Sequence, residues 1–153
     1  MRNWLLLHGA IIVGLLFIIF SNPEHVISKS IAFLAILLLI VNWNMYPLFY
    51  TIKKGKNKSL KKRLVQYSRK MMPLHPRIGL AGILLAVIHG WLMWQNTPSL
   101  SSTHYSGVFT LGMGLFLLGT GWYRRRKATG RRRKLHLYSA GTFLFLVILH
   151  IIL

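Results

Sequence analysis

Long apolar stretches alternate with short polar segments along the whole chain. A hydrocarbon core about 30 Å thick is crossed by a helix of roughly 20 mostly apolar residues. Five stretches meet or nearly meet that length, and they run over residues Trp4–Phe20, Ile31–Ile52, Ile78–Trp94, Tyr105–Tyr123 and Leu135–Leu153. The pattern predicts an all-α protein: a polytopic membrane helical bundle of about five transmembrane helices, with residues 1–153 forming a single transmembrane domain.

The residues at the ends of the first two stretches indicate whether each stretch is a spanning helix. The tripeptide 21–23, Ser-Asn-Pro, follows the first stretch in place of a small-x-small cleavage site, so we expect a spanning helix and not a signal peptide. Asn42, Asn44 and Pro47 interrupt the end of the second stretch. Polar side chains within a span usually face the interior of the bundle, and we expect the same here.

The composition limits the chemistry that the chain can perform. Of 153 residues, 54% are hydrophobic, and 20 Lys and Arg stand against one acidic residue, Glu24, for a formal net charge of +19. An enzyme that works with paired carboxylates is excluded because there is no second carboxylate. The lack of cysteine excludes disulfides, iron–sulfur clusters, thiolate zinc sites and c-type haem attachment. Proton or cation transport is disfavoured, since such sites usually use carboxylates inside the membrane.

The basic residues are gathered in two loops, and this argues against a nucleic-acid partner, which would need them spread over a folded surface. Nine lie in residues 51–72 and eight in residues 124–134. With five spans, Arg2 and Arg77 fall on the same side as both loops, and only Lys29 falls opposite. The positive-inside rule then predicts cytoplasmic basic loops, an inside N-terminus and an outside C-terminus, in a multi-pass protein of the cell membrane.

The basic loops also suit contact with the anionic head groups of the lipid bilayer. Residues 59–72 are a candidate for an interfacial amphipathic helix, whose apolar side chains Leu60, Leu64, Val65 and Tyr67 would face the membrane. Topology and lipid contact are therefore two interpretations of the same charges.

Four of the seven histidines form a regular pattern. His75 and His89 lie 14 residues apart around the third stretch, and His136 and His150 lie 14 residues apart around the fifth. Fourteen helical residues rise about 21 Å and make nearly four full turns, so each pair shares one helix face. Because both spans run from inside to outside, we expect His75 level with His136 near the cytoplasmic face, and His89 level with His150 near the outer face.

Two facing imidazoles in an apolar bundle suit a b-type haem, which needs two axial nitrogens and an apolar slot. Zinc or copper would need three or four ligands, and no Cys, Asp or Glu lies nearby. The haem propionates need cations or hydrogen-bond donors. Arg77 and the arginines of residues 124–134 suit an inner haem. Polar residues of the outer loop suit an outer haem: Gln95, Asn96, Ser101, Ser102 and His104.

The glycines near the four histidines and the three remaining histidines are interpreted separately. Glycines close to the four histidines would let a flat macrocycle approach the backbone, although glycine also packs membrane helices generally; they are Gly79, Gly82, Gly90 and Gly141. The remaining histidines are expected to be interfacial or hydrogen-bonded residues; they are His8, His25 and His104.

The segments around the four histidines resemble a known family. They are Leu74-His75-Pro76-Arg77-Ile78-Gly79 through His89, and Arg133-Lys134-Leu135-His136-Leu137 through His150. They resemble the ferric reductase-like transmembrane domain, the di-haem core of ferric-chelate reductases, NADPH oxidases and the bacterial haem subunit of a periplasmic methionine sulfoxide reductase. The resemblance covers residues 30–153 and rests on the H-x13-H motif of the third and fifth helices. It implies an inner haem on His75 and His136 and an outer haem on His89 and His150.

The sequence also departs from the family pattern. The flavin- and nicotinamide-binding domain of the larger members has no counterpart, and no G-x-G-x-x-G element follows a strand. Residues 112–114, Gly-Met-Gly, lie inside a span and are interpreted as a packing site. Pro76 suits the first turn of a helix, so His75 would bind from the very start of its helix.

Two bis-histidine haems b predict transmembrane electron transfer in an oxidoreductase component, since a six-coordinate iron offers no open position for a substrate. The donor would be a cytoplasmic flavoprotein reductase or membrane quinol, and the outer-face acceptor would be ferric iron, oxygen or a redox protein. One alternative is a quinol-linked cytochrome b membrane anchor subunit. The other is a non-redox small membrane assembly protein whose histidines are incidental.

Overall fold

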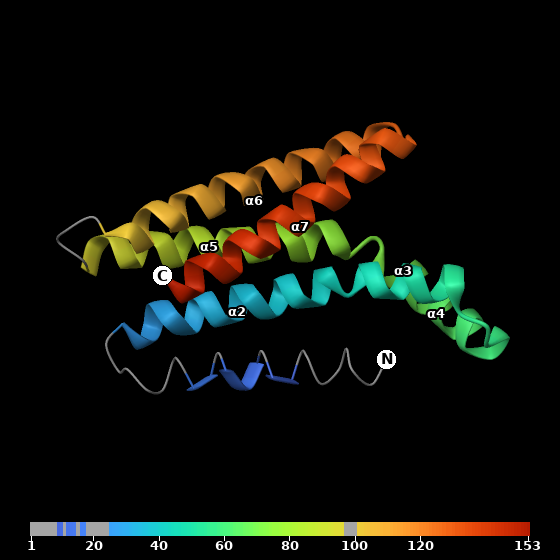
Figure 1. Ribbon diagram of the computed structural model, residues 1–153, viewed down its shortest axis with the longest axis horizontal. Helices are drawn as coiled ribbons and strands as arrows, with labels where there is room; N and C mark the ends of the chain where they lie inside the picture. The colour runs from blue at the N-terminus through green and yellow to red at the C-terminus, as the bar shows by residue number, and fades with distance from the viewer. Residues whose placement is uncertain (1–8, 11, 15, 18–24, 97–100) are drawn as a thin grey trace. The chain divides into compact units, whose positions relative to one another are not determined.

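A computed structural model describes residues 9–10, 12–14, 16–17, 25–96 and 101–153, and every regular element in these ranges is an α-helix. Between residues 26 and 152 the described part of the chain forms six helices (Figure 1): α2 (Val26–Trp43), α3 (Met45–Lys54), α4 (Lys58–Met71), α5 (His75–Asn96), α6 (Ser102–Arg126) and α7 (Gly130–Ile152). The all-α prediction is therefore confirmed for the described part of the chain.

Three segments among the described residues are long and apolar enough to cross a membrane: residues 26–54, which join α2 and α3, then α5 and α7. They contain the second and third predicted stretches and all of the fifth except Leu153. The fourth stretch is helical within α6, but α6 is not one of the three segments. Several glycine, serine and threonine residues lower its hydropathy. The first stretch, Trp4–Phe20, falls mostly outside the described residues.

Helical backbone hydrogen bonds continue through the polar α2–α3 junction, from the Asn44 N–H to the Ile40 carbonyl at 3.1 Å and from the Leu48 N–H to the Asn44 carbonyl at 3.2 Å. Asn44 ends α2 and precedes α3 with helical dihedral angles, and its side-chain amide donates a hydrogen bond to the Ile40 carbonyl at 2.8 Å. Pro47 lies in the first turn of α3, where a missing N–H is tolerated. Asn42 donates to the carbonyl of His75 at 3.0 Å, at the start of α5. The prediction that polar residues here face other helices is confirmed for Asn42.

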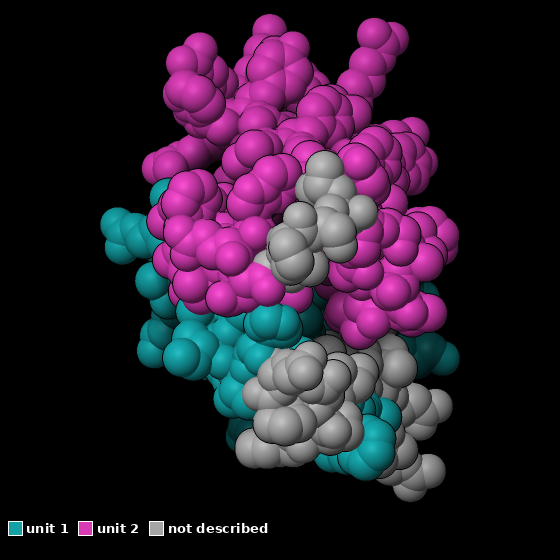
Figure 2. All heavy atoms as spheres, turned by 90° about the vertical axis from the view of Figure 1, so that its left-hand side faces the viewer, with its two compact units in different colours: residues 1–82 teal, residues 83–153 magenta. Residues whose placement is uncertain are grey.

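The chain divides into two compact units, Met1–Gly82 and Ile83–Leu153, which Figure 2 colours separately. The boundary falls within α5. In the first unit, α3 and α4 pack as a short hairpin, and Gly82 lies close to Leu39 of α2. The side chain of Asn57 caps α4 by accepting a hydrogen bond from the backbone N–H of Leu60 at 3.0 Å.

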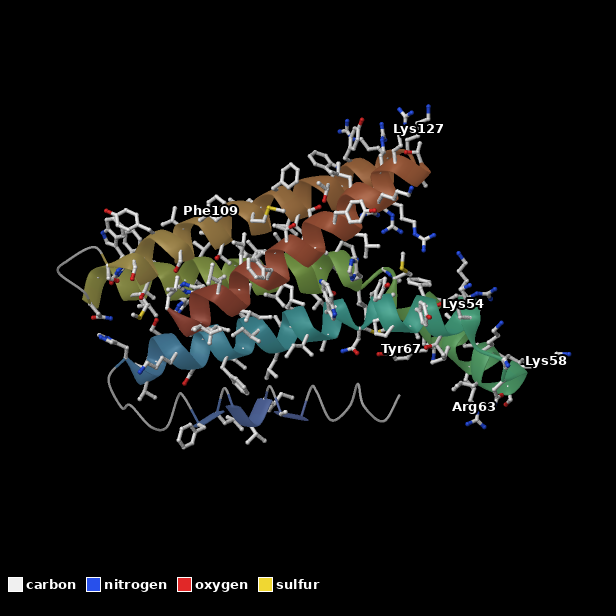
Figure 3. The ribbon with its side chains drawn as sticks, viewed as in Figure 1. Lys54, Lys58, Arg63, Tyr67, Phe109 and Lys127 are labelled. Carbon is white, nitrogen blue, oxygen red and sulfur yellow. The ribbon has the colours of Figure 1, made fainter. Side chains whose placement is uncertain are left out.

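Helix α4 carries most of the first basic loop. Its apolar residues Leu60, Leu64 and Val65 are half-buried, and Tyr67 is exposed. Lys58 and Arg63 are exposed, and both project away from the ribbon (Figure 3). The helix predicted over residues 59–72 is therefore present, with its apolar side partly covered by protein.

In the second unit, α6 and α7 form an antiparallel hairpin around a short connection (Figure 1). The Arg132 guanidinium closes this turn. It donates to the carbonyls of Tyr123 at 3.0 Å and Lys127 at 3.2 Å, and it lies 3.5 Å from the centre of the Tyr123 ring. Thr129 caps α7 by accepting a hydrogen bond from the Arg132 backbone N–H at 3.3 Å. These contacts set the register in which the two helices pack.

Candidate functional site

The four predicted ligands all lie on the helices where the sequence predicts them, half-buried. His75 is the first residue of α5, and His89 lies further along the same helix. His136 and His150 lie on α7. His89, His136 and His150 belong to the second compact unit, and His75 belongs to the first.

The rings of His89 and His150 approach each other closely. Their centroids are 6.4 Å apart, and their planes make an angle of 70°. Imidazole nitrogens bind metals at about 2.0–2.1 Å, so a centroid separation of 6.4 Å leaves room for one metal atom between the two rings. His89 and His150 are therefore the pair that could hold a haem iron. The structure brings together the two residues of the predicted outer pair.

The hydrogen bond that His150 makes determines which of its nitrogens could bind a metal. The Ser106 hydroxyl donates its single proton to the Thr103 carbonyl at 2.9 Å. Its oxygen lies 2.9 Å from Nδ1 of His150. With the hydroxyl proton directed to the Thr103 carbonyl, the imidazole would be the donor in this second contact, with its proton on Nδ1. That tautomer of His150 would present the lone pair of Nε2, the arrangement typical of a metal-bound histidine.

His136 makes the same arrangement with a threonine. The Thr120 hydroxyl donates to the Leu117 carbonyl at 2.8 Å, and its oxygen lies 3.1 Å from Nδ1 of His136. Ser139 Oγ lies 3.4 Å from the same oxygen, but its own proton goes to the Leu135 carbonyl. Thr120 is buried. With the Thr120 proton directed to the Leu117 carbonyl, His136 would likewise carry its proton on Nδ1, and Nε2 would be its coordinating nitrogen.

The partners of the two histidines are spaced as the histidines are. Ser106 and Thr120 lie 14 residues apart on α6, and His136 and His150 lie 14 residues apart on α7. Because α6 and α7 run antiparallel, moving 14 residues toward the C-terminus of α6 matches moving 14 residues toward the N-terminus of α7. Each hydroxyl therefore lies opposite its own imidazole. Between them, the Thr110 hydroxyl lies 2.7 Å from the Ser106 carbonyl of its own helix and 3.3 Å from the Leu146 carbonyl of α7. The shared face predicted for His136 and His150 is confirmed, and it is the face toward α6.

A glycine follows each of these hydroxyl residues and makes room for the ring. A Cβ at Gly107 would lie 3.1 Å from Cε1 of His150, and a Cβ at Gly121 would lie 3.3 Å from Cε1 of His136. Halfway between them, a Cβ at Gly114 would lie 3.0 Å from Cε2 of Phe143. Small residues allow membrane helices to approach closely. Here they also allow two imidazoles to fit between the helices, and Gly114 is a packing site as the sequence predicts.

The sequence analysis missed Ser106, Thr120 and the glycines that follow them. A signal was present, because Ser106-Gly107 and Thr120-Gly121 repeat a hydroxyl residue followed by glycine at the 14-residue spacing of the histidines. Of the glycines that were predicted to matter, Gly82 approaches α2. A Cβ at Gly90 or at Gly141 would meet nothing within 4 Å.

The remaining predicted residues have simpler surroundings. His104 forms a capping box at the start of α6, with its Nδ1 2.8 Å from the Ser101 hydroxyl. Its ring also lies edge-on to Trp94, with centroids 6.4 Å apart. His104 is therefore hydrogen-bonded, as the sequence predicts, and His25 precedes α2 in the left-handed conformation. Arg77 is exposed in the first turn of α5, and His8 lies outside the described residues.

Within the described ranges, no group of three or more His, Asp or Glu side chains could hold a metal ion. A haem needs only two protein ligands, and the His89–His150 separation and the Nδ1 hydrogen bond of His150 fit that demand. The sequence matches no known family model, and comparisons with curated proteins and with solved structures likewise give no match.

Proposed function

We propose that the protein transfers electrons across the cell membrane through two haem b groups. His89 and His150 would bind the outer haem, and His75 and His136 would bind the inner one. Bound haem would supply reversible one-electron Fe(III)/Fe(II) chemistry, and with two histidine ligands held by the protein each iron would take no substrate. The protein residues then have to bind the haems, orient the imidazoles and exclude water.

One observation carries this proposal: the pairing of His89 with His150. The centroid separation of 6.4 Å leaves room for one iron between the rings, and the Ser106 contact is compatible with an Nδ1–H tautomer of His150 that presents Nε2. A hydrogen-bonded core histidine needs neither a second imidazole beside it nor that tautomer. His136 supports the inner site in the same way through Thr120.

The proposed topology has five spans, with the N-terminus and basic loops in the cytoplasm and the C-terminus outside. The support is the division of the charge between residues 51–72 and residues 124–134. Helix α6 would be the fourth span despite its lower hydropathy. It exposes Val108, Phe109 and Phe116, and Phe109 projects outward from the helix in Figure 3. Its polar residues Ser106, Thr110 and Thr120 instead make contacts with α7.

Electrons would enter from the cytoplasmic side. The exposed basic residues of the α3–α4 hairpin would attract an acidic cytoplasmic flavoprotein reductase, and membrane quinol is the other donor to be tested. The acceptor at the outer face would be ferric iron, oxygen or a redox protein. Purified chain can be offered either a quinol analogue or NAD(P)H with a flavin reductase. The donor that reduces the α-bands separates the flavoprotein-linked function from a quinol-linked membrane anchor.

Haem stoichiometry by pyridine haemochrome tests the central claim. We expect two haems b in the parent chain and a loss of about one haem in each of His89→Ala, His150→Ala and His136→Ala. His25→Asn is the control, because it changes a half-buried histidine that is assigned to neither haem, and asparagine tolerates the left-handed backbone conformation that His25 adopts. Its haem content should equal that of the parent. Protein made with ample haem that contains none would refute the proposal and favour a non-redox membrane protein.

A further inference from the structure

Helix α6 contributes no proposed haem ligand, yet it contacts both ligands of α7 in the same way. Ser106 and Thr120 each donate a hydroxyl proton to a backbone carbonyl three residues earlier in their own helix. Each therefore has only its oxygen lone pairs to offer to the imidazole beside it. Ordinary helix packing would not require both histidines to meet a hydroxyl whose proton is already used.

We propose that Ser106 and Thr120 are positioning residues that fix the tautomer of His150 and His136 and so regulate the reduction potentials of the two haems. The inference rests on the proposed function, which it deepens by assigning one tuning residue to each haem. Each hydroxyl oxygen accepts the Nδ1–H of its histidine, at 2.9 Å from His150 and 3.1 Å from His136. Each imidazole is thereby oriented and presents Nε2 to the iron.

The strength of the acceptor determines how electron-rich the imidazole becomes. A neutral hydroxyl draws the Nδ1 proton less strongly than a carboxylate would, so each ligand keeps the character of a neutral imidazole. Removal of the hydroxyl makes the ligand a poorer electron donor, which stabilises Fe(III) less and raises the reduction potential. The outer haem responds to Ser106 and the inner haem to Thr120, because each hydroxyl contacts only its own histidine.

The test is a spectroscopic redox titration of the haem-loaded chain and of Ser106→Ala and Thr120→Val. In Ser106→Ala we expect the outer-haem potential to rise while the inner one stays constant, and in Thr120→Val the reverse. A tenfold change in the ratio of oxidised to reduced haem corresponds to about 59 mV for one electron. Haem retention should fall about tenfold at the affected site. Ser106→Thr and Thr120→Ser keep the hydroxyl and should restore both properties.

Thr110→Val is the matched control. It removes a buried hydroxyl from the same face of α6, between the other two, but Thr110 contacts the Ser106 and Leu146 carbonyls and no imidazole. Both potentials should stay at the parent values in this variant. Equal shifts in all three variants would mean that α6 hydroxyls act only on packing, and this would overturn the inference.

A second measurement needs no variant. Nitrogen-15 NMR of histidine-labelled, haem-free chain should show the Nδ1–H tautomer at His150 and His136, and the opposite tautomer would overturn the inference. Two haems bound in the parent, with potentials that ignore Ser106 and Thr120, would refute the positioning role and leave the proposed function standing. A parent chain that binds no haem would refute both.

Discussion

An alanine at position 107 would push directly against the ring of His150. A Cβ there lies 3.1 Å from Cε1 of His150 and 3.6 Å from each ring nitrogen. Carbon atoms in good contact lie about 3.5–4.0 Å apart, so the ring has to move by a few tenths of an ångström. His150 has little freedom to do so, since Ser106 holds its Nδ1 and the His89 ring lies edge-on beside it.

The size of the expected effect follows from the tolerance of metal sites. Metal–ligand distances are held within about 0.2 Å, and the displacement in Gly107→Ala is at least as large. Disturbed ligand support typically costs 10–100-fold in affinity. We therefore expect the outer haem to bind about tenfold more weakly, which corresponds to about 1.4 kcal/mol. The inner haem should bind as it does in the parent.

Haem titration of detergent-solubilised, haem-free protein measures this directly through the α-band of each reduced haem. Gly112→Ala is the matched control, because a Cβ at Gly112 meets nothing within 4 Å. Both variants replace glycine by alanine inside α6 and gain the same helix propensity, so that contribution cancels in the comparison. Equal outer-haem affinity in Gly107→Ala and Gly112→Ala would refute the reasoning, since the ring of His150 would then not be a ligand in the position described.

Two further predictions concern packing and topology. In Gly114→Val the new side chain would meet Ile83 Cδ1, 2.6 Å from the Cβ position, and Phe143; overpacking of this kind costs about 1–3 kcal/mol. We expect Gly114→Val to lower the midpoint of thermal unfolding in detergent. Gly119→Ala is the comparison, because a Cβ at Gly119 meets nothing within 4 Å, and an equal midpoint in the two variants would contradict the prediction. The chain has no cysteine, so Lys58→Cys and Ser101→Cys each introduce a single label site. In intact cells an impermeant thiol reagent should label position 101 and not position 58, and the opposite result would invert the proposed orientation.

The sequence alone determined the helical elements and the candidate ligands. Apolar stretches of near-spanning length predicted the helices because a helix satisfies its own backbone hydrogen bonds, whatever surrounds it. The 14-residue spacing predicted that His136 and His150 share a face, because helix geometry is fixed by residue number. Five spans and their orientation stay predictions, since the described residues contain three segments apolar enough to cross a membrane.

The tertiary structure decided what lies opposite each histidine. Ser106 and Thr120 are more than ten residues from their partners in sequence, and ordinary helix residues by composition. Only the register of the α6–α7 hairpin, set at its turn by Thr129 and Arg132, places them against Nδ1 of His150 and His136. A shift of one residue in that register would rotate the hydroxyls away. Contacts of this kind depend on packing between helices, which periodicity within one helix does not specify.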